Sequence, residues 1–154
     1  TNTLIMVGGN DWSSAERWIE QSDTLKYLKD PANNLAFEAH VYFDKDASGT
    51  YKYSYEEEEC YPEKGIDRVK PFVEWIKQNK FHGFIVEYGI PYNDPRWNET
   101  LDLFLGYLQE NGINGTYWAA GPWWDSYFMA ITPKDGKDRP QMPIIEKYTC
   151  SLKK

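Results

Sequence analysis

The sequence has only two cysteines, Cys60 and Cys150, and they lie too far apart for the paired spacings of zinc or redox motifs. A disulfide between them is left open. No glycine-rich phosphate loop follows an apolar run, because "VGGNDW" (7–12) lacks the order GxGxxG and no GK[ST] occurs. The sequence therefore disfavours a nucleotide site.

Long apolar runs are also missing. None approaches the roughly 20 residues that span a bilayer. The stretch "TNTLIMVGGN" (1–10) lacks the basic end and long apolar segment of a signal peptide. We expect the chain as given to be soluble, and a leader removed by processing is left open.

Basic charge is scarce, with 17 Lys and Arg against 24 Asp and Glu and a net charge of −7. This balance argues against nucleic acid and anionic membranes as partners and favours a neutral or cationic ligand. The acids do not indicate a metal: "DKDASGT" (44–50) begins like an EF-hand loop, but Tyr55 stands where the bidentate acid belongs. We expect a polar turn there, a solvated loop at "EEEE" (56–59), and neither metal nor cofactor.

Aromatic residues, in contrast, are abundant. They form 17% of the chain, with 7 Trp and 12 Tyr. Aromatic side chains beyond the needs of a core often line sites that stack flat ligands such as sugars. An unusually aromatic core is the alternative, and composition does not separate the two.

Apolar runs alternate with helical patterns along residues 1–154, which is one domain's worth of chain. The runs predict buried strands at 3–7, 34–43, 82–89 and 113–121, and the patterns between them predict helices at 12–22, 71–79, 93–112 and 142–154. Pro71 and Pro95 suit first helical positions, and Gly112 suits a left-handed stop. This order predicts an α/β fold with a parallel sheet covered by helices.

Polar residues recur near the ends of the predicted strands. Since side chains alternate along a strand, His40 shares a face with Glu38 and Tyr42. By the same count, Glu87 shares a face with Ile85 and Gly83, and Trp118 with Thr116. The last residues on these faces converge at the carboxyl edge of a parallel sheet, where such folds place their sites. Glu38 lies one step deeper and is expected to be an interior, hydrogen-bonded acid.

With these residues placed, the chain resembles the C-terminal half of a family 5 glycoside hydrolase, close to the endo-β-1,4-glucanase (cellulase) branch. The stretches that carry the resemblance are "GNDWSSA" (9–15), "NLAFEAHVYFDKDASGT" (34–50), "FIVEYG" (84–89) and "GTYWAAG" (115–121). The family folds as an eight-stranded (β/α) barrel and hydrolyses β-glucans with retention, using two glutamates. The resemblance implies a half barrel of four parallel strands with flanking helices. It also implies a carbohydrate substrate, namely a β-1,4-glucan, a cello-oligosaccharide or an aryl β-glucoside, and secretion if the parent protein is cellulase-like.

The resemblance also implies roles for individual residues. Glu87 would be the nucleophile, Tyr42 would hydrogen-bond to it, and His40 would help to hold the reacting sugar. Trp118 would be the sugar-stacking platform. Trp12 and nearby Asn10 would contact the substrate on the leaving-group side. Trp123 and Trp124 would extend the cleft.

One part of the family's machinery is missing from this sequence. The acid/base glutamate of the family sits in an Asn-Glu pair that ends the fourth strand, but Asn98-Glu99 falls inside a predicted helix. We expect a homodimer of two half barrels to close the sheet. The acid/base would then be improvised from Asp125, His40 or the partner's Glu87. The alternatives are a non-catalytic carbohydrate-binding or structural half barrel, or a fragment of a longer cellulase.

Overall fold

The computed structural model describes residues 3–149, which form a four-stranded parallel sheet flanked by helices. The strands follow one another in the order β1-β2-β3-β4, each beside the next in sequence. Their bounds are β1 Ile5–Gly8, β2 Leu35–Val41, β3 His82–Tyr88 and β4 Asn114–Tyr117. The predicted parallel α/β sheet is confirmed.

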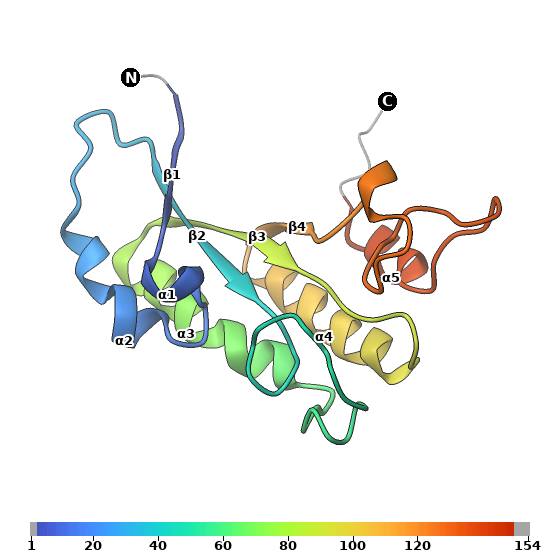
Figure 1. The fold of residues 1–154 in the computed structure, drawn as a ribbon. Helices are drawn as coiled ribbons and strands as arrows, with labels where there is room; N and C mark the ends of the chain where they lie inside the picture. The colour runs from blue at the N-terminus through green and yellow to red at the C-terminus, as the bar shows by residue number, and fades with distance from the viewer. Residues whose placement is uncertain (1–2, 150–154) are drawn as a thin grey trace.

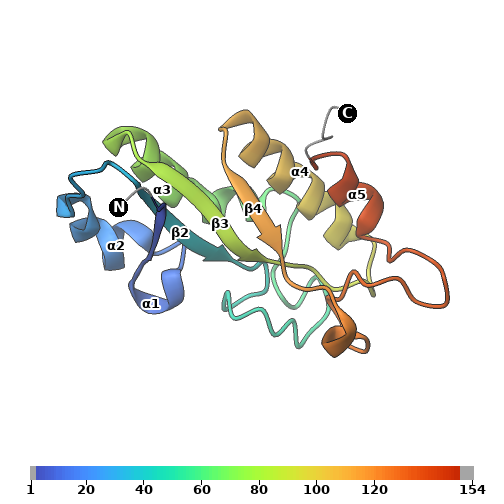
Figure 2. The same ribbon diagram turned by 90° about the horizontal axis from the view of Figure 1, so that it is seen from above.

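Helices cover one side of this sheet and leave the other side open (Figures 1 and 2). The α-helices are α1 Asn10–Ser13, α2 Trp18–Ser22, α3 Lys64–Asn79, α4 Arg96–Glu110 and α5 Met142–Glu146, and two 3-10 turns span Asp23–Tyr27 and Pro122–Trp124. Helices α3 and α4 pack side by side behind the central strands, and α5 packs on α4. None of the helices in residues 3–149 combines the length and apolar character that crossing a membrane requires.

Three helix predictions need correction. The helix expected at 12–22 is broken, because Asp11, Trp12 and Ser13 adopt left-handed φ values and regular helix resumes only at Trp18. Helix α3 begins at Lys64, so Pro71 lies inside it; the lost hydrogen bond is outweighed by burial of the helix face. The last helix ends at Glu146, and its closing lysines, like Cys150, lie outside the described residues.

The helix at 93–112 is closer to expectation. Pro95 lies just before α4 rather than at its first position, and the Asp94 carboxylate accepts a hydrogen bond from the Arg96 amide (2.9 Å). Gly112 has φ +66°, the predicted left-handed stop. The apolar stripe of α4 is buried as predicted: Leu101, Phe104, Leu105 and Leu108.

The core lies between the sheet and the helices and is rich in aromatic rings. Trp18 and Phe72 meet edge-to-face with centroids 4.7 Å apart, and Phe37 and Trp75 do so at 4.9 Å. The predicted alternation in β2 is confirmed, because Phe37, Ala39 and Val41 point into this core. The aromatic core is therefore present, with Trp18, Trp75 and Trp97 buried in it, whereas Trp12 and Trp123 are 85% and 89% exposed and lie outside it.

The open side of the sheet and its two outer edges lack cover. Strand β1 was predicted to be buried, but Ile5 and Met6 are 43% and 38% exposed, since β1 pairs only with β2. Strand β4 lies at the opposite edge and pairs only with β3. Neither edge strand carries a charged residue, although charges commonly protect the edges of monomeric sheets.

A β-bulge changes which face Glu87 occupies. Ala39 pairs with Ile85 and His40 with Glu87, which leaves Val86 as an extra residue in β3. Ile85 therefore belongs to the buried core, and a Cβ at Gly83 would meet Ile76 of α3. The prediction that Glu87 shares a face with Ile85 and Gly83 is wrong, because the bulge turns Glu87 to the open side.

Candidate active site

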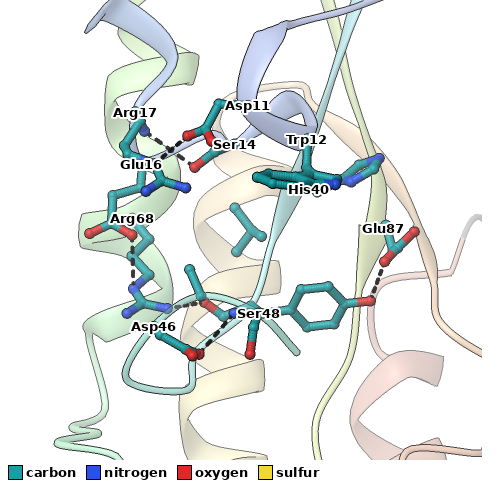
Figure 3. A pocket seen from close by; sticks show the side chains of 13 residues that line it. Asp11, Trp12, Ser14, Glu16, Arg17, His40, Asp46, Ser48, Arg68 and Glu87 are labelled. Carbon is teal, nitrogen blue, oxygen red and sulfur yellow. Dashed lines mark hydrogen bonds and ion pairs between the residues drawn. The ribbon is translucent and has the colours of Figure 1, made fainter. Parts of the chain in front are cut away.

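A pocket of about 340 Å³ lies at the carboxyl end of β2 and β3, where the strand-end residues were expected to converge (Figure 3). Trp12, His40 and Glu87 lie toward one end of it, and Glu16, Arg17 and Arg68 toward the other. Its size is within the range of small-molecule sites. The remaining lining residues are Asp11, Ser14, Val41, Tyr42, Asp46, Ala47 and Ser48.

Glu87 is held by a tyrosine on the neighbouring strand. The Tyr42 hydroxyl donates a hydrogen bond of 2.5 Å to Glu87 Oε1. His40 is the register partner of Glu87 across β2 and β3, so both flank the same point of the rim. A bond from a neutral hydroxyl to a carboxylate is charge-assisted and therefore stronger than one between neutral groups. The structure brings together the three residues predicted to act in catalysis: Glu87, Tyr42 and His40.

Trp12 reaches the pocket from a left-handed turn. Asp11, Trp12 and Ser13 have φ values of 54°, 52° and 54°, an uncommon conformation for residues with side chains. Hydrogen bonds hold this turn in place: Gly9 N donates to Ser13 Oγ (2.9 Å), and the Asn10 side chain donates to the Gln21 carbonyl (2.8 Å). Asn10 thus stabilises the turn that presents Trp12 and does not itself line the pocket.

The backbone around Tyr42 is fixed from several sides. Arg68 Nη1 donates to the Tyr42 carbonyl (2.5 Å), and the next amide, Phe43 N, donates to the Tyr51 hydroxyl (2.9 Å). The same Tyr51 hydroxyl donates to the Gly89 carbonyl (2.6 Å), which joins the ends of β2 and β3. Gly49, with φ +73°, lies so close that a Cβ there would come within 2.9 Å of the Tyr42 ring.

The loop after β2 is organised by the buried carboxylate of Asp44. It accepts hydrogen bonds from the amides of Gly49, Thr50 and Tyr51 and from the Ser48 hydroxyl, at 2.9 to 3.2 Å. The predicted polar turn is confirmed, because these oxygens accept from groups of the same loop. The prediction of a solvated loop at "EEEE" (56–59) is wrong for Glu58. Its side chain is 3% exposed and accepts hydrogen bonds from the Lys45 and Tyr53 amides.

Besides Asn10, four predicted residues lie outside this pocket: Trp118, Trp123, Trp124 and Asp125. The amide of Trp118 donates to the Tyr88 carbonyl (2.8 Å), and its ring meets Trp124 edge-to-face at 4.9 Å. Trp123 projects into solvent, and Asp125 is exposed, with its carbonyl accepting from Arg139. The segment that follows β4 therefore forms a separate aromatic group beside the pocket.

Comparison with known proteins identifies the relatives of this arrangement. The family model described as cellulase (glycosyl hydrolase family 5) matches residues 1–123. The chain belongs to glycosyl hydrolase family 5.

Individual relatives of this family 5 chain are about twice its length. It is 37% identical over 153 residues to the probable endo-beta-1,4-glucanase B of Aspergillus kawachii, covering 96% of this chain and 44% of that protein. The Pseudomonas stutzeri endoglucanase Cel5A, solved in complex with cellobiose, matches with a TM-score of 0.87 and 42% identity over 95% of this chain and 44% of its own. XacCel5A in complex with cellopentaose matches with a TM-score of 0.85 and 38% identity, over 96% of this chain and 49% of its own. The predicted half-barrel architecture is thereby confirmed.

The polar half of the pocket was not predicted from the sequence of this family 5 chain. Arg68 contacts Glu16 Oε2 at 3.3 Å, and Arg17 contacts Asp11 at 2.5 Å. Glu16 falls within the helix predicted at 12–22, and nothing in that pattern indicated a pocket residue. A signal for Arg68 was present: it lies four residues before Phe72 on the apolar stripe of α3, where a charge needs a partner.

The Tyr42 phenol gives this family 5 chain a testable pH dependence. Burial, followed by the hydrogen bond to Glu87, raises the pKa of Tyr42 well above its ordinary value of 10.0. The folded state then holds this proton more tightly than the unfolded state. The stability that the protonated phenol contributes is therefore present below pH 10 and is lost as the pH rises above it.

In urea unfolding at a series of pH values, Tyr42→Phe should lose stability less steeply above about pH 10 than the wild type. Tyr27→Phe, which removes a phenol that is 72% exposed, is the matched control. Equal slopes for Tyr42→Phe and the wild type would contradict the prediction.

Proposed function

We propose that this chain forms the nucleophile-bearing half of a retaining glycosidase that cleaves β-1,4-glucosidic bonds, with Glu87 as the nucleophile. The observation that carries the proposal is the hydrogen bond from Tyr42 to Glu87 inside a pocket at the carboxyl ends of parallel strands. The named activity of the A. kawachii relative and the cello-oligosaccharides in the two solved relatives support the substrate class. Secretion would follow from a polymeric substrate of this kind.

The chemistry needs two carboxyl groups. Glu87 attacks the anomeric carbon while an acid about 5 to 5.5 Å away protonates the departing oxygen, and water then hydrolyses the glycosyl-enzyme ester. Of the other acids in the pocket, Asp11 and Glu16 are paired with arginines, and Asp46 accepts a hydrogen bond from the Ser48 amide in its own loop. We therefore assign the acid/base role to a group that faces Glu87 across the open side of the sheet. Within this chain His40 and Asp125 remain the candidates.

Substrate contacts are proposed on both sides of Glu87. Trp12, which is 85% exposed above the pocket, would stack on the leaving-group sugar. Trp118 would stack on the sugar that is attacked, with Trp123 and Trp124 extending that side. His40, beside Glu87, would bind hydroxyl groups of the reacting sugar.

An activated aryl β-cellobioside tests the proposal, because its good leaving group needs little acid assistance. Release of the phenol by the purified chain is expected, with retention at the anomeric carbon by NMR. Glu87 would be excluded as a working nucleophile if the chain neither released phenol nor was covalently labelled on Glu87 by a fluoro-cellobioside.

A non-catalytic carbohydrate-binding role is the second candidate. The observation in its favour is the pair of exposed tryptophans, Trp12 and Trp123, in a chain whose described residues pair no second carboxylate with Glu87. Binding of cellopentaose by calorimetry without release of phenol from the activated substrate would favour this candidate.

We further propose that a second copy of the chain closes the barrel. β1 and β4 are parallel, lie at opposite edges and carry no charge. In a two-fold dimer, β1 of each copy can therefore pair with β4 of the other copy. Light scattering at micromolar concentration should then give twice the mass of one chain. Met6→Lys, on the 38% exposed edge residue, should give a monomer, whereas Leu103→Lys on α4, at 39% exposure, should not. A monomeric wild type would contradict this closure.

A further inference from the structure

Arg68 is a buried cation at the junction of α3, the loop after β2 and the pocket. Its side chain is 8% exposed, yet it lines the pocket beside Glu16. Nη1 donates to the Tyr42 carbonyl at 2.5 Å, Nη2 donates to the Lys45 carbonyl at 3.0 Å, and Nε lies 3.3 Å from Glu16 Oε2. One guanidinium therefore joins a helix, the strand end that bears Tyr42, and the segment that precedes α2.

We infer that Arg68 is a positioning residue that sets the Tyr42 hydroxyl against Glu87 and thereby the reactivity of the proposed nucleophile. This inference rests on the proposed function of Glu87. Arg68 does not reach the reacting atoms; it acts through the backbone of Tyr42.

The contacts explain why an arginine is needed at this point. Tyr42 is the first residue beyond β2, so no ladder hydrogen bond continues at its carbonyl. Its ring reaches Glu87 only if that peptide is held in one orientation, and a planar guanidinium with donors on both arms can hold two carbonyls at once. Burying a cation among apolar neighbours of α3 costs free energy unless partners satisfy it, and here two carbonyls and a carboxylate do so.

The other anchors hold different parts of this segment. The Tyr51 hydroxyl fixes the following amide, Phe43 N, and Gly49 lies against the Tyr42 ring. Neither anchor contacts the Tyr42 carbonyl. The Tyr42 carbonyl and the Phe43 amide belong to one planar peptide group, which Arg68 and Tyr51 hold at opposite ends. Removal of Arg68 would leave this group held at the Phe43 end alone, and we expect the phenol to be less firmly placed against Glu87.

The experiment compares Arg68→Gln, Arg68→Lys and a control, Lys70→Gln, on the same helix. Lys70 is exposed and forms only a surface pair with Glu74 at 3.9 Å. The probe is a fluoro-cellobioside with dinitrophenolate as leaving group. A Glu87 carboxylate oxygen forms the bond to the anomeric carbon, and dinitrophenolate departs with the electron pair, so no acid is required. The neighbouring fluorine slows hydrolysis of the ester, and mass spectrometry counts the labelled protein.

Arg68→Gln should lower the maximal labelling rate roughly tenfold or more, with a smaller change in the concentration for half-maximal rate, because orientation and not binding is lost. Arg68→Lys should recover part of the rate, and Lys70→Gln should match the wild type. Equal maximal rates for Arg68→Gln and the wild type would overturn the inference. An unlabelled wild type would instead count against Glu87 as nucleophile.

A second readout does not depend on sugar chemistry. The Tyr42 hydroxyl proton, protected by its bond to Glu87, should give a downfield proton NMR signal that Tyr42→Phe removes. Arg68→Gln should weaken or shift this signal at temperatures where circular dichroism shows the fold intact. An unchanged signal in Arg68→Gln would overturn the inference even if labelling fails in every variant.

Discussion

Glu87→Gln is expected to lower phenol release from an activated aryl β-cellobioside by roughly a thousandfold or more, the scale of loss seen when a nucleophile is removed. Glutamine keeps the shape of the side chain and can accept the hydrogen bond from Tyr42, which in the wild type is 2.5 Å long. It lacks the negative charge needed to attack the anomeric carbon. The measurement is the initial rate of phenol release together with covalent labelling by the fluoro-cellobioside.

Glu99→Gln is the matched control for this prediction. Glu99 is an exposed residue in the first turn of α4, within the Asn-Glu pair that the sequence places on a helix. The variant should release phenol at the wild-type rate. Turnover that survives Glu87→Gln unchanged would mean that another group performs the attack.

Asp44→Ala should lower the free energy of unfolding by roughly 3 to 5 kcal/mol, as when a buried hydrogen-bond network is broken. The carboxylate of Asp44 is fully buried and accepts from three amides and one hydroxyl. Alanine would leave the buried amide of Gly49 without its acceptor. Urea unfolding followed by circular dichroism provides the measurement.

Asp46→Ala removes an acid from the same loop and serves as the comparison. Asp46 is exposed and accepts one bond from the Ser48 amide at 3.2 Å. Its replacement should cost about 1 kcal/mol or less, as is usual for surface positions. Similar losses for the two variants would show that the loop does not depend on the Asp44 carboxylate.

The sheet could be predicted because four apolar runs alternate with helical patterns, although three of those helices have other bounds than expected. Two polar residues on β2, Glu38 and His40, alternate with core residues, so the face of His40 could be counted directly. Counting failed on β3, where Val86 is inserted opposite β2. A bulge depends on pairing with the neighbouring strand and leaves no mark in the spacing of side chains.

The pocket was predictable only in part for a similar reason. Tyr42 and Glu87 come from strand ends, whose relative position follows from the parallel sheet. Glu16 and Arg68 meet through tertiary packing between the segment before α2 and the start of α3. The position of Trp12 depends on a left-handed turn that local preferences disfavour and that distant hydrogen bonds maintain. Strand β4 ends at Tyr117, earlier than the apolar run at 113–121 predicted.

The Tyr51 hydroxyl, which joins the Phe43 amide to the Gly89 carbonyl, has a thermodynamic consequence. With Asp44, it orders the rim of the pocket using groups that belong to this chain alone. The conformational entropy of placing Tyr42 and Glu87 is thus lost when this half folds, not when the barrel closes or a sugar arrives. Any surface that completes the barrel would meet a preorganised template, so its binding free energy could go into contacts and not into ordering Glu87, the proposed nucleophile.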